Sequence, residues 1–198
     1  MNQLMIFVKN PELGKVKTRL ASSIGVEAAL EVYRNLLNHT RRITIKLECQ
    51  KTVGYSQFVD DNDIWDNSIY DKELQIGHDL GEKMSGAFQN FFQNESSKVV
   101  IIGSDCSELT KEIIEESFIM LDDNDVVIGP AKDGGYYLLG MKKYYPQLFE
   151  NKKWSTNSVL SSTIVDLENL EVDYHILQEL SDIDRVEDLK IMVDQPKI

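Results

Sequence analysis

The chain has 198 residues, 42% of them apolar and 27% charged, which is typical of a soluble globular protein and excludes a disordered or collagen-like chain. Its length suits a single domain over residues 1–198. Asp and Glu outnumber Lys and Arg by 33 to 21, for a net charge of −12. Such an acidic protein is a poor candidate for nucleic-acid binding, because neutralising a phosphate backbone needs basic side chains.

The charge is unevenly distributed along the chain. Residues 1–51 hold nine Lys and Arg against four Asp and Glu, a net of +5, while residues 52–198 hold 12 against 29, a net of −17. A basic segment in an acidic protein either binds an anion or arises by chance. The local sequence has to distinguish the two.

The cysteines and the N-terminus point to the cytoplasm. Cys49 and Cys106 are far apart, with no CxxC pair and no histidine at ligand spacing, so we expect free, reduced thiols. No apolar run approaches 18 residues, and apolar residues 1–8 are too few for a signal peptide. We expect a cytoplasmic protein without a membrane partner, and the sequence leaves its oligomeric state open.

Short apolar runs alternate with helical patterns along the chain. The runs predict strands at 4–8, 51–55, 73–76, 99–102, 126–128, 136–141 and 172–177. Apolar residues at a 3.6-residue period predict helices at 26–47, 80–92, 110–121, 156–167 and 185–193, with Thr110 as an N-cap. Polar residues 57–71 predict a surface loop. The alternation predicts a mainly parallel sheet with helices on both faces, which binds ligands beyond the carboxyl ends of its strands.

The segment after the first predicted strand combines a glycine with four cations. Lys9, Gly14, Lys15, Lys17 and Arg19 lie between a strand end and a helix start. Flexible backbone amides, a helix N-terminus and several basic donors are what nucleotide phosphates need. The segment is not a Walker A loop, because Val16 follows Gly14-Lys15. A solvated basic loop is the alternative.

Two further strand ends carry candidate site residues. Asp105 follows the strand at 99–102 and suits a divalent cation bound to phosphates, although a helix or turn cap is an alternative role. The segment Lys132, Asp133, Gly134 and Gly135 follows the next strand. Its paired glycines permit close approach to a ligand, but Asp-Gly is also the usual hairpin-turn dipeptide.

A last pair of carboxylates precedes the C-terminal helical pattern. Asp182 and Asp184 point the same way if the chain there is extended. The alternative is that Asp184 caps the helix at 185–193 and that Glu187 completes a capping box. Capping and metal binding are compatible.

Together these blocks resemble a family of bacterial proteins similar to nucleotide-diphospho-sugar transferases. The resemblance covers residues 3–190 and rests on Lys-x-Pro-x-x-Gly-x-x-Lys-Thr-Arg-Leu from Lys9, Gly-x-Asp-Leu-Gly-Glu-x-Met from Gly77, Gly-Ser-Asp-Cys from Gly103, Gly-Pro-Ala-x-Asp-Gly-Gly-Tyr-Tyr from Gly129, Trp-Ser-Thr from Trp154 and Asp-Ile-Asp from Asp182. The Lys-Thr-Arg-Leu and Asp-Gly-Gly blocks are also similar to 2-phospholactate guanylyltransferase.

The resemblance implies a GT-A-type fold, a Rossmann-like α/β/α sandwich with a mostly parallel sheet and one antiparallel strand. By position, Lys9, Lys15, Lys17 and Arg19 would hold nucleotide phosphates, and the loop at Asp133 would face the acceptor. Asp105 and Asp184 would hold Mg²⁺ or Mn²⁺, with Asp182 as the alternative second ligand. This chain departs from the family pattern in having Ser107 where a proline usually follows the cysteine.

Three functions are compatible with these residues. The favoured one is a metal-dependent nucleotidyltransferase that transfers NMP from an NTP to a small phosphorylated or hydroxyl acceptor and releases pyrophosphate, with Arg19, Lys17 and Asp105 as catalytic residues. The alternatives are a glycosyltransferase with a nucleotide-sugar donor and a non-catalytic nucleotide-binding protein. Glycosyltransferases of this fold usually carry Asp-x-Asp, whereas residues 104–107 offer one aspartate, which favours nucleotidyl transfer.

Overall fold

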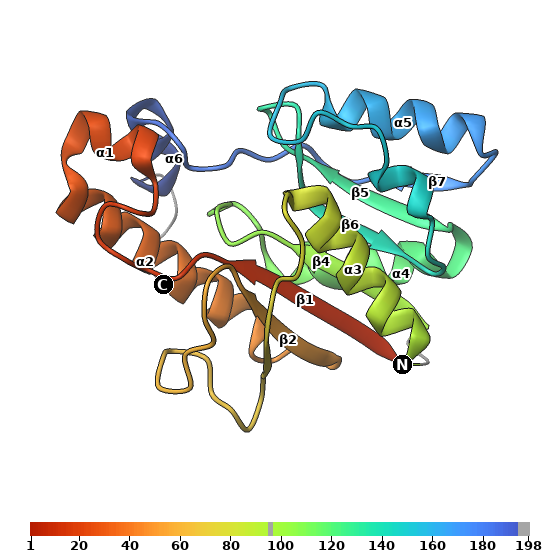
Figure 1. Ribbon diagram of the computed structural model, residues 1–198, viewed down its shortest axis with the longest axis horizontal. Coiled ribbons are helices and arrows are strands. Elements are labelled where there is room, and N and C mark those ends of the chain that lie inside the picture. Colours follow the sequence, from red (N-terminus) through yellow and green to blue (C-terminus); the bar gives the residue numbers. More distant parts are fainter. Residues whose placement is uncertain (95–96, 194–198) are drawn as a thin grey trace.

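The computed structural model describes residues 1–94 and 97–193 and shows a seven-stranded sheet between two layers of helices (Figure 1). The strand order is β3-β2-β1-β4-β6-β5-β7, and every neighbouring pair is parallel except the two that involve β6. The strands are β1 (Asn2–Val8), β2 (Gln50–Tyr55), β3 (Asp71–Leu74), β4 (Lys98–Ile102), β5 (Val126–Pro130), β6 (Tyr136–Met141) and β7 (Tyr174–Ile176). The predicted three-layer, mostly parallel α/β fold with one antiparallel strand is confirmed.

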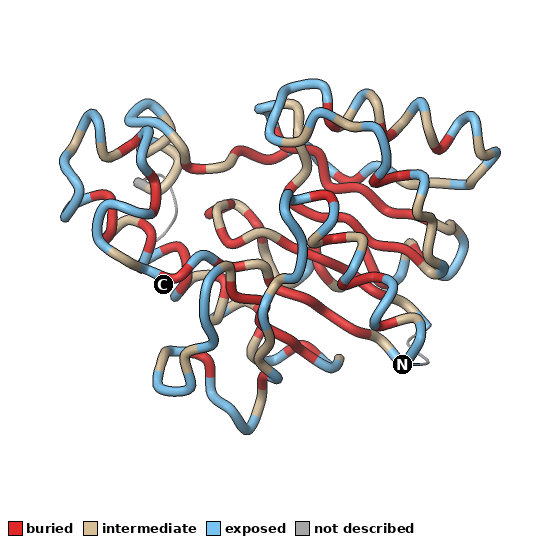
Figure 2. Tube along the Cα trace, in the orientation of Figure 1, coloured by how far each residue is buried: buried red, intermediate tan, exposed pale blue. Residues whose placement is uncertain are grey.

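Helices cover both faces of the sheet and bury its central strands (Figure 2). One apolar cluster joins one face of the sheet to α2 and α4, and a second joins the other face to α3, η1 and α5. The helices are α1 (Thr18–Ile24), α2 (Val26–Thr44), α3 (Leu80–Gln93), α4 (Lys111–Asp123), α5 (Val159–Asn169) and α6 (Leu189–Val193), with short 3₁₀ turns η1 (Pro146–Phe149) and η2 (Val186–Asp188). No helix in the described ranges is long and apolar enough to cross a bilayer.

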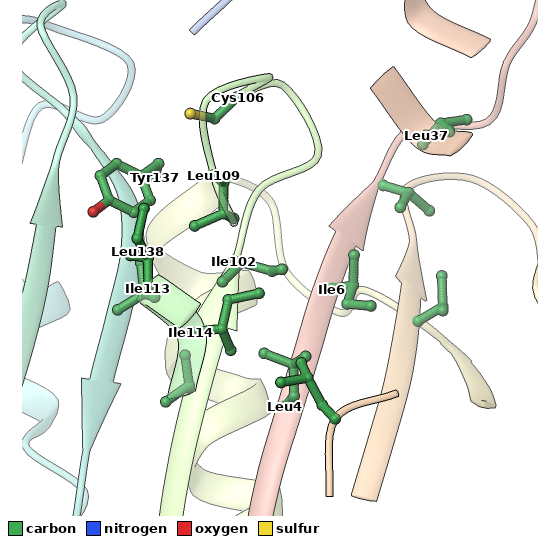
Figure 3. Packing of buried hydrophobic residues seen from close by; sticks show 14 of the residues in the cluster. Leu4, Ile6, Leu37, Ile102, Cys106, Leu109, Ile113, Ile114, Tyr137 and Leu138 are labelled. Atoms are coloured by element: carbon green, nitrogen blue, oxygen red, sulfur yellow. The ribbon is translucent and has the colours of Figure 1, made fainter. Parts of the chain in front are cut away.

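The first cluster continues beyond the sheet to the strand ends (Figure 3). Leu4 and Ile6 of β1 and Ile102 of β4 pack in the same cluster as Leu109 and Cys106 of the loop that follows β4. All five residues are buried. The loop that carries Asp105 is therefore anchored on both sides by buried apolar residues, which fixes where its carboxylate projects.

Several element boundaries differ from the predicted ones. Gly25, with a φ of 90°, separates α1 from α2, so a short helix precedes the one predicted at 26–47. The edge strand β3 begins and ends two residues earlier than predicted, because Asp71–Leu74 are the residues that pair with the end of β2. Beyond the strand, the Gln75 side chain donates to the carbonyls of Val8 and Gly54. The helix predicted from 156 begins at Val159, after a turn in which the Thr156 hydroxyl donates to the carbonyl of residue 153.

The prediction of a plain surface loop at 57–71 is only partly right. Trp65 and Tyr70 are each 2% exposed and pack edge to face in the first apolar cluster. Lys72 and Asp63 form an ion pair beside them at 2.8 Å. Although most residues of this segment are polar, its two large aromatic side chains are buried and attach the loop to the sheet.

The predicted N-cap at Thr110 is confirmed, because its hydroxyl accepts from the Ile113 amide at the start of α4. The capping proposed for the last helix is wrong in detail. Its range is split between η2 and α6, and Asp188, not Glu187, accepts from the amides of Asp184 and Arg185 at 2.9 and 2.7 Å. The Asp184 side chain is left to pair elsewhere.

Candidate functional site

Three cavities adjoin one another at the carboxyl edge of the sheet. The first, which we call the basic cavity, has a volume of about 270 Å³ and is lined by Lys9, Lys15, Val16, Lys17, Thr18, Arg19, Tyr33, Asp105 and Asp184. All four cations predicted from the sequence to bind phosphate thus line one hollow. Gly14 does not line it. Its φ of 74° instead serves the turn that precedes Lys15.

Three of the four cations of the basic cavity differ in how exposed they are and in the ion pair that each forms. Lys17 is nearly buried, with a side chain 5% exposed, and its Nζ lies 2.9 Å from Asp105 Oδ1. Arg19 is 66% exposed and its Nη1 lies 2.7 Å from Asp184 Oδ2. Lys15 pairs with Glu12 at 2.9 Å on the surface. Lys17 is therefore a fixed donor, while Arg19 and Lys15 can reorient at little cost.

The backbone around these cations is held by local structure. Lys17 has a φ of 49°, in the left-handed region, where a non-glycine residue costs on the order of 1 kcal/mol. The Tyr33 hydroxyl of α2 accepts from the Lys9 amide at 2.8 Å and donates to the Lys9 carbonyl at 3.0 Å. Tyr33 thus fixes the end of β1, a role that sequence reasoning missed because a tyrosine at a helical spacing also suits a core position.

Asp105 lies at the junction between β4 and the C-terminal segment. The Ile183 amide donates to the Asp105 carbonyl at 2.9 Å, and Cys106 forms an antiparallel bridge with Asp182. These backbone contacts bring together two carboxylate blocks that are about 80 residues apart in sequence. Burial raises the pKa of the Cys106 thiol to about 12, helped by the Asp182 charge, so this thiol stays protonated.

The two C-terminal carboxylates occupy different environments. Asp184 is 40% exposed and pairs with Arg19, whereas burial raises the pKa of Asp182 to about 7. The charges of Asp105 and Asp133 push the same pKa up, and Lys17 opposes them. The structure thus places four carboxylates near one another. Local sequence patterns left caps and turns as alternative roles for them, whereas the family resemblance had already paired Asp105 with Asp184, or with Asp182, as metal ligands.

A second, central cavity of about 420 Å³ shares Lys9, Tyr33 and Asp105 with the basic one. It extends from the end of β1 to Ser56 after β2, His78 and Leu80 at the start of α3, and Tyr136 and Tyr137 of β6, among others. The block at residues 77–84 has a capping role here. Asp79 accepts from the Glu82 amide at 2.9 Å, and Glu82 accepts from the His78 amide at 2.8 Å.

The third cavity, also about 420 Å³, is the acidic cavity. It is lined by Arg19, Leu80, Asp105, Asp133, Gly135, Tyr136, Trp154, Ser155, Thr156, Asn157, Val159 and Asp182. It meets the basic cavity at Arg19 and Asp105, and the central cavity at Leu80, Asp105, Tyr136, Ser155 and Asp182. Of the residues that the structure describes, Asp105 alone lines all three.

The loop predicted to face an acceptor is a hairpin turn between β5 and β6, as its alternative interpretation proposed. Asp133 accepts from the Gly135 amide at 2.8 Å, and Gly134 has a φ of 88°. Asp133 and Gly135 line the acidic cavity, but Lys132 and Gly134 do not. The Lys132 amide instead donates to the Leu180 carbonyl at 3.0 Å.

Gly134 and Gly81 are required because other groups approach their backbones closely. A Cβ atom on Gly134 would lie 2.2 Å from the Asn157 carbonyl oxygen, and one on Gly81 would lie 2.0 Å from Trp154 Nε1. The two glycines therefore let the segment 154–157 dock against both the hairpin and α3. This segment forms one wall of the acidic cavity. The Trp-Ser-Thr block contributed to the family resemblance, but sequence reasoning assigned it no role. The structure places it in this wall.

The donor set suits a hard divalent cation. Asp105, Asp182 and Asp184 offer carboxylate oxygens, the ligands that Mg²⁺ prefers. In the described residues no group of three or more His, Cys, Asp or Glu is already arranged as a metal cluster. Mg²⁺ needs no such cluster, because it keeps waters and takes most of its remaining ligands from phosphates. The carboxylates beside a cationic hollow fit such an ion.

The three-layer α/β/α arrangement around a mostly parallel sheet is the fold of nucleotide-diphospho-sugar transferases and related nucleotidyltransferases. The chain belongs to the family described as uncharacterized protein conserved in bacteria (DUF2064), whose model matches residues 40–156. A candidate nucleotide-diphospho-sugar transferase from Desulfovibrio desulfuricans G20 is 30% identical, with a TM-score of 0.89 over 99% of this chain and 87% of that one.

Two more distant proteins are also similar. 2-Phospho-L-lactate guanylyltransferase from Methanocaldococcus fervens is 26% identical over 140 residues, which span 70% of this chain and 62% of that enzyme. The inositol-1-phosphate CTP transferase from T. maritima is 13% identical and superposes with a TM-score of 0.60 over 98% of this chain and 93% of that one. At that identity the second likeness concerns the fold alone.

Proposed function

We propose that this protein is a metal-dependent nucleotidyltransferase that transfers NMP from an NTP to a small acceptor and releases pyrophosphate. The observation that carries this proposal is that Asp105 lines the basic, central and acidic cavities at once. A reaction between two bound molecules needs adjoining sites that meet at the reacting atoms. The similarity to a guanylyltransferase supports the same chemistry.

In this proposal the triphosphate binds in the basic cavity and the nucleoside in the central one. Lys17 is the best-placed hydrogen-bond donor to the phosphates, because its ammonium group is buried and its position is fixed by Asp105. Arg19 borders both the basic and the acidic cavities and can follow the leaving pyrophosphate. Lys9 and Lys15 add positive charge at the rim. These cations stabilise the negative charge that grows on the leaving group.

Asp105 and Asp184 would hold Mg²⁺, with Asp182 as a further carboxylate beside them. The ion supplies charge neutralisation of the phosphate oxygens when it is bound. In the protein as described, Lys17 and Arg19 occupy one oxygen of Asp105 and one of Asp184. Nucleotide and metal binding would therefore be mutually favourable, because phosphates can take over the cations as the metal takes over the carboxylates.

The acceptor would bind in the acidic cavity, opposite the triphosphate. An acceptor oxygen forms a bond to the α-phosphorus while the bond from the α-phosphorus to the bridging oxygen of the β-phosphate breaks. The electron pair of that bond leaves with pyrophosphate, and the acceptor proton passes to water. The protein contributes position and charge compensation.

A direct test is pyrophosphate release from each of the four NTPs with Mg²⁺ and a small-molecule extract as the source of acceptor. We expect release with at least one NTP, and loss of it in Asp105→Asn. Asp123→Asn is the matched control, because Asp123 is an exposed aspartate at the far end of α4. Absence of pyrophosphate release with folded protein would contradict the proposal.

Glycosyl transfer from a nucleotide-sugar is the second candidate. It is favoured by the 30% identity to a candidate nucleotide-diphospho-sugar transferase. Thermal denaturation separates the two donors. A Tm increase with an NTP and Mg²⁺ that exceeds the increase with nucleotide-sugars supports nucleotidyl transfer, and the reverse order supports glycosyl transfer.

A further inference from the structure

We propose that the acceptor is an uncharged polyhydroxyl compound of the sugar or sugar-alcohol class, whose hydroxyl is the attacking group. This inference rests on the proposed nucleotidyl transfer and adds the chemical class of its second substrate. It excludes acceptors that carry a phosphate or another anionic group, although the named enzymes among the similar proteins act on phosphorylated compounds. The acidic cavity carries the argument.

The charges that line the acidic cavity disfavour an anion. Three carboxyl groups line it, those of Asp105, Asp133 and Asp182, against the single cation Arg19. The carboxyl group of Asp182 is only partly ionised at neutral pH, because burial raises its pKa to about 7. Arg19 pairs with Asp184 at 2.7 Å, and in the proposed function it turns from Asp184 to the triphosphate rather than to the acceptor. The lysines of the basic cavity do not line the acidic one. An anionic acceptor would thus face like charges, and the bound triphosphate would add more.

The uncharged lining suits hydroxyl groups. Ser155 offers a hydroxyl and Asn157 an amide, and both can donate and accept hydrogen bonds. The Thr156 hydroxyl donates to the carbonyl of residue 153 and can still accept a hydrogen bond. Trp154 adds an aromatic wall, with its ring stacked on Phe149 at a centroid distance of 6.3 Å. A polyol presents C–H surface and hydroxyls on one small molecule, which matches an aromatic wall surrounded by polar groups.

An ammonium group is a weaker match than a neutral polyol. Lys17 already balances Asp105 at 2.9 Å. Asp133 uses one oxygen to accept from the Gly135 amide within its own turn. Asp105 and Asp133 are therefore partly compensated within the protein, which weakens their attraction for an ammonium group. The lining groups other than the three carboxyl groups and Arg19 are neutral.

Packing within the protein fixes the wall of this cavity. The close approach of Gly134 to Asn157 and of Gly81 to Trp154 fixes the segment 154–157 from both sides. The Leu160 amide also donates to the Gly134 carbonyl at 2.9 Å, which ties the start of α5 to the hairpin. A preformed wall sets specificity by shape and hydrogen bonding, at a low entropic cost on binding.

The inference predicts the linkage in the product. A hydroxyl acceptor gives a phosphodiester that contains a single phosphorus atom, with pyrophosphate as the other product and the hydroxyl proton released to water. A phosphorylated acceptor would instead give a P–O–P linkage between the acceptor and the nucleotide. Phosphorus NMR distinguishes the two, because only the second shows coupling between two phosphorus atoms.

The class of acceptor can be tested without knowing its identity. A bacterial small-molecule extract is separated on an anion exchanger, and the unretained fraction is separated further on a cation exchanger. Each fraction is incubated with protein, Mg²⁺ and the four NTPs labelled at the α-phosphorus. Alkaline phosphatase then removes unreacted NTP, and the protected labelled product is isolated for mass spectrometry and phosphorus NMR.

We expect a labelled product with one phosphorus atom from the fraction that neither exchanger retains. Product only from the anionic fraction, or a P–O–P linkage, would overturn the inference and leave nucleotidyl transfer standing. Product only from the cationic fraction would also overturn it. If no fraction yields product, the transferase activity itself is contradicted, and the inference that rests on it falls too.

A charge-removing variant tests the electrostatic cause. Asp133→Asn keeps an oxygen for the Gly135 amide but removes the carboxylate charge. We expect the preference for the neutral acceptor over its own monophosphate, measured as a ratio of kcat/KM, to fall by about 10-fold. Asp123→Asn should leave that ratio unchanged. If Asp133→Asn lowers kcat/KM for both acceptors in parallel, the carboxylate acts only in the turn, and the charge argument is wrong.

Discussion

The basic and acidic cavities share Asp105 and Arg19 but are assembled in different ways. The lysines and the arginine of the basic cavity all come from one segment of 11 residues, which runs from the end of β1 into the first turn of α1. The acidic cavity is assembled from the start of α3, the β5–β6 hairpin, the segment leading into α5 and the C-terminal Asp182. A site within one segment can be altered one residue at a time, whereas a site shared by several elements depends on how those elements pack.

The largest expected effect is at the shared residue. Asp105→Asn removes the carboxylate that borders all three cavities, and we expect kcat/KM to fall by about 10³-fold. It also leaves the nearly buried Lys17 ammonium without its charged partner. Because Asp105 is itself 42% exposed, the loss of stability should be modest, about 1 kcal/mol. Steady-state kinetics and urea denaturation measure the two effects.

The matched variant Asp123→Asn should change neither quantity appreciably. A loss of activity below 10-fold in Asp105→Asn would place the reacting atoms away from the point where the cavities meet. That result would favour separate sites over a common reaction centre.

The next effect should separate the cations of the basic cavity. Lys17→Met is expected to weaken NTP binding by 10-fold to 100-fold, because Lys17 is a fixed, desolvated donor. Lys15→Met should weaken it by only about 2-fold, because Lys15 is exposed and pairs with Glu12. Calorimetric titration with an NTP and Mg²⁺ measures both dissociation constants. Equal effects would indicate that only the total charge of the segment matters.

The difference between the cavities also explains what the sequence could reveal. The cations of residues 9–19 were recognisable because they are adjacent in sequence and follow a strand. No local pattern signals that Asp105 lies near Asp182, and only the family resemblance paired Asp105 with these C-terminal carboxylates. A long-range backbone bridge between Cys106 and Asp182 brings the two blocks together. The Trp154 wall depends on contacts with Gly81 and on the docking of the next residues against Gly134, which no local pattern encodes.

Changes in packing should disturb the acidic cavity selectively. In Gly134→Ala the new methyl group would lie 2.2 Å from a backbone oxygen at a φ of 88°, so the wall has to move. We expect stability to fall by about 1–3 kcal/mol and the acceptor KM to rise by about 10-fold. The dissociation constant for NTP should change by less than 2-fold, because the basic cavity lies on other elements.

Gly86→Ala is the control for that glycine substitution. Gly86 lies within α3, and its nearest contact to an added Cβ atom is 3.6 Å, an ordinary distance. It should raise stability by up to about 1 kcal/mol and leave both substrates unaffected. Parallel losses of nucleotide and acceptor binding in Gly134→Ala would show that the two cavities are mechanically coupled.

The smallest effect concerns the residue that positions Asp184. Asp188 accepts from the amides of Asp184 and Arg185 through a single oxygen, Oδ2. Asp188→Asn removes the negative charge and weakens these two hydrogen bonds, so Asp184 should be less firmly oriented toward Arg19. We expect the Mg²⁺ concentration for half-maximal activity to rise by about 3-fold, while kcat at saturating Mg²⁺ stays within 2-fold. A fall in kcat that excess Mg²⁺ does not restore would mean that Asp188 acts on the reaction itself rather than through the orientation of Asp184.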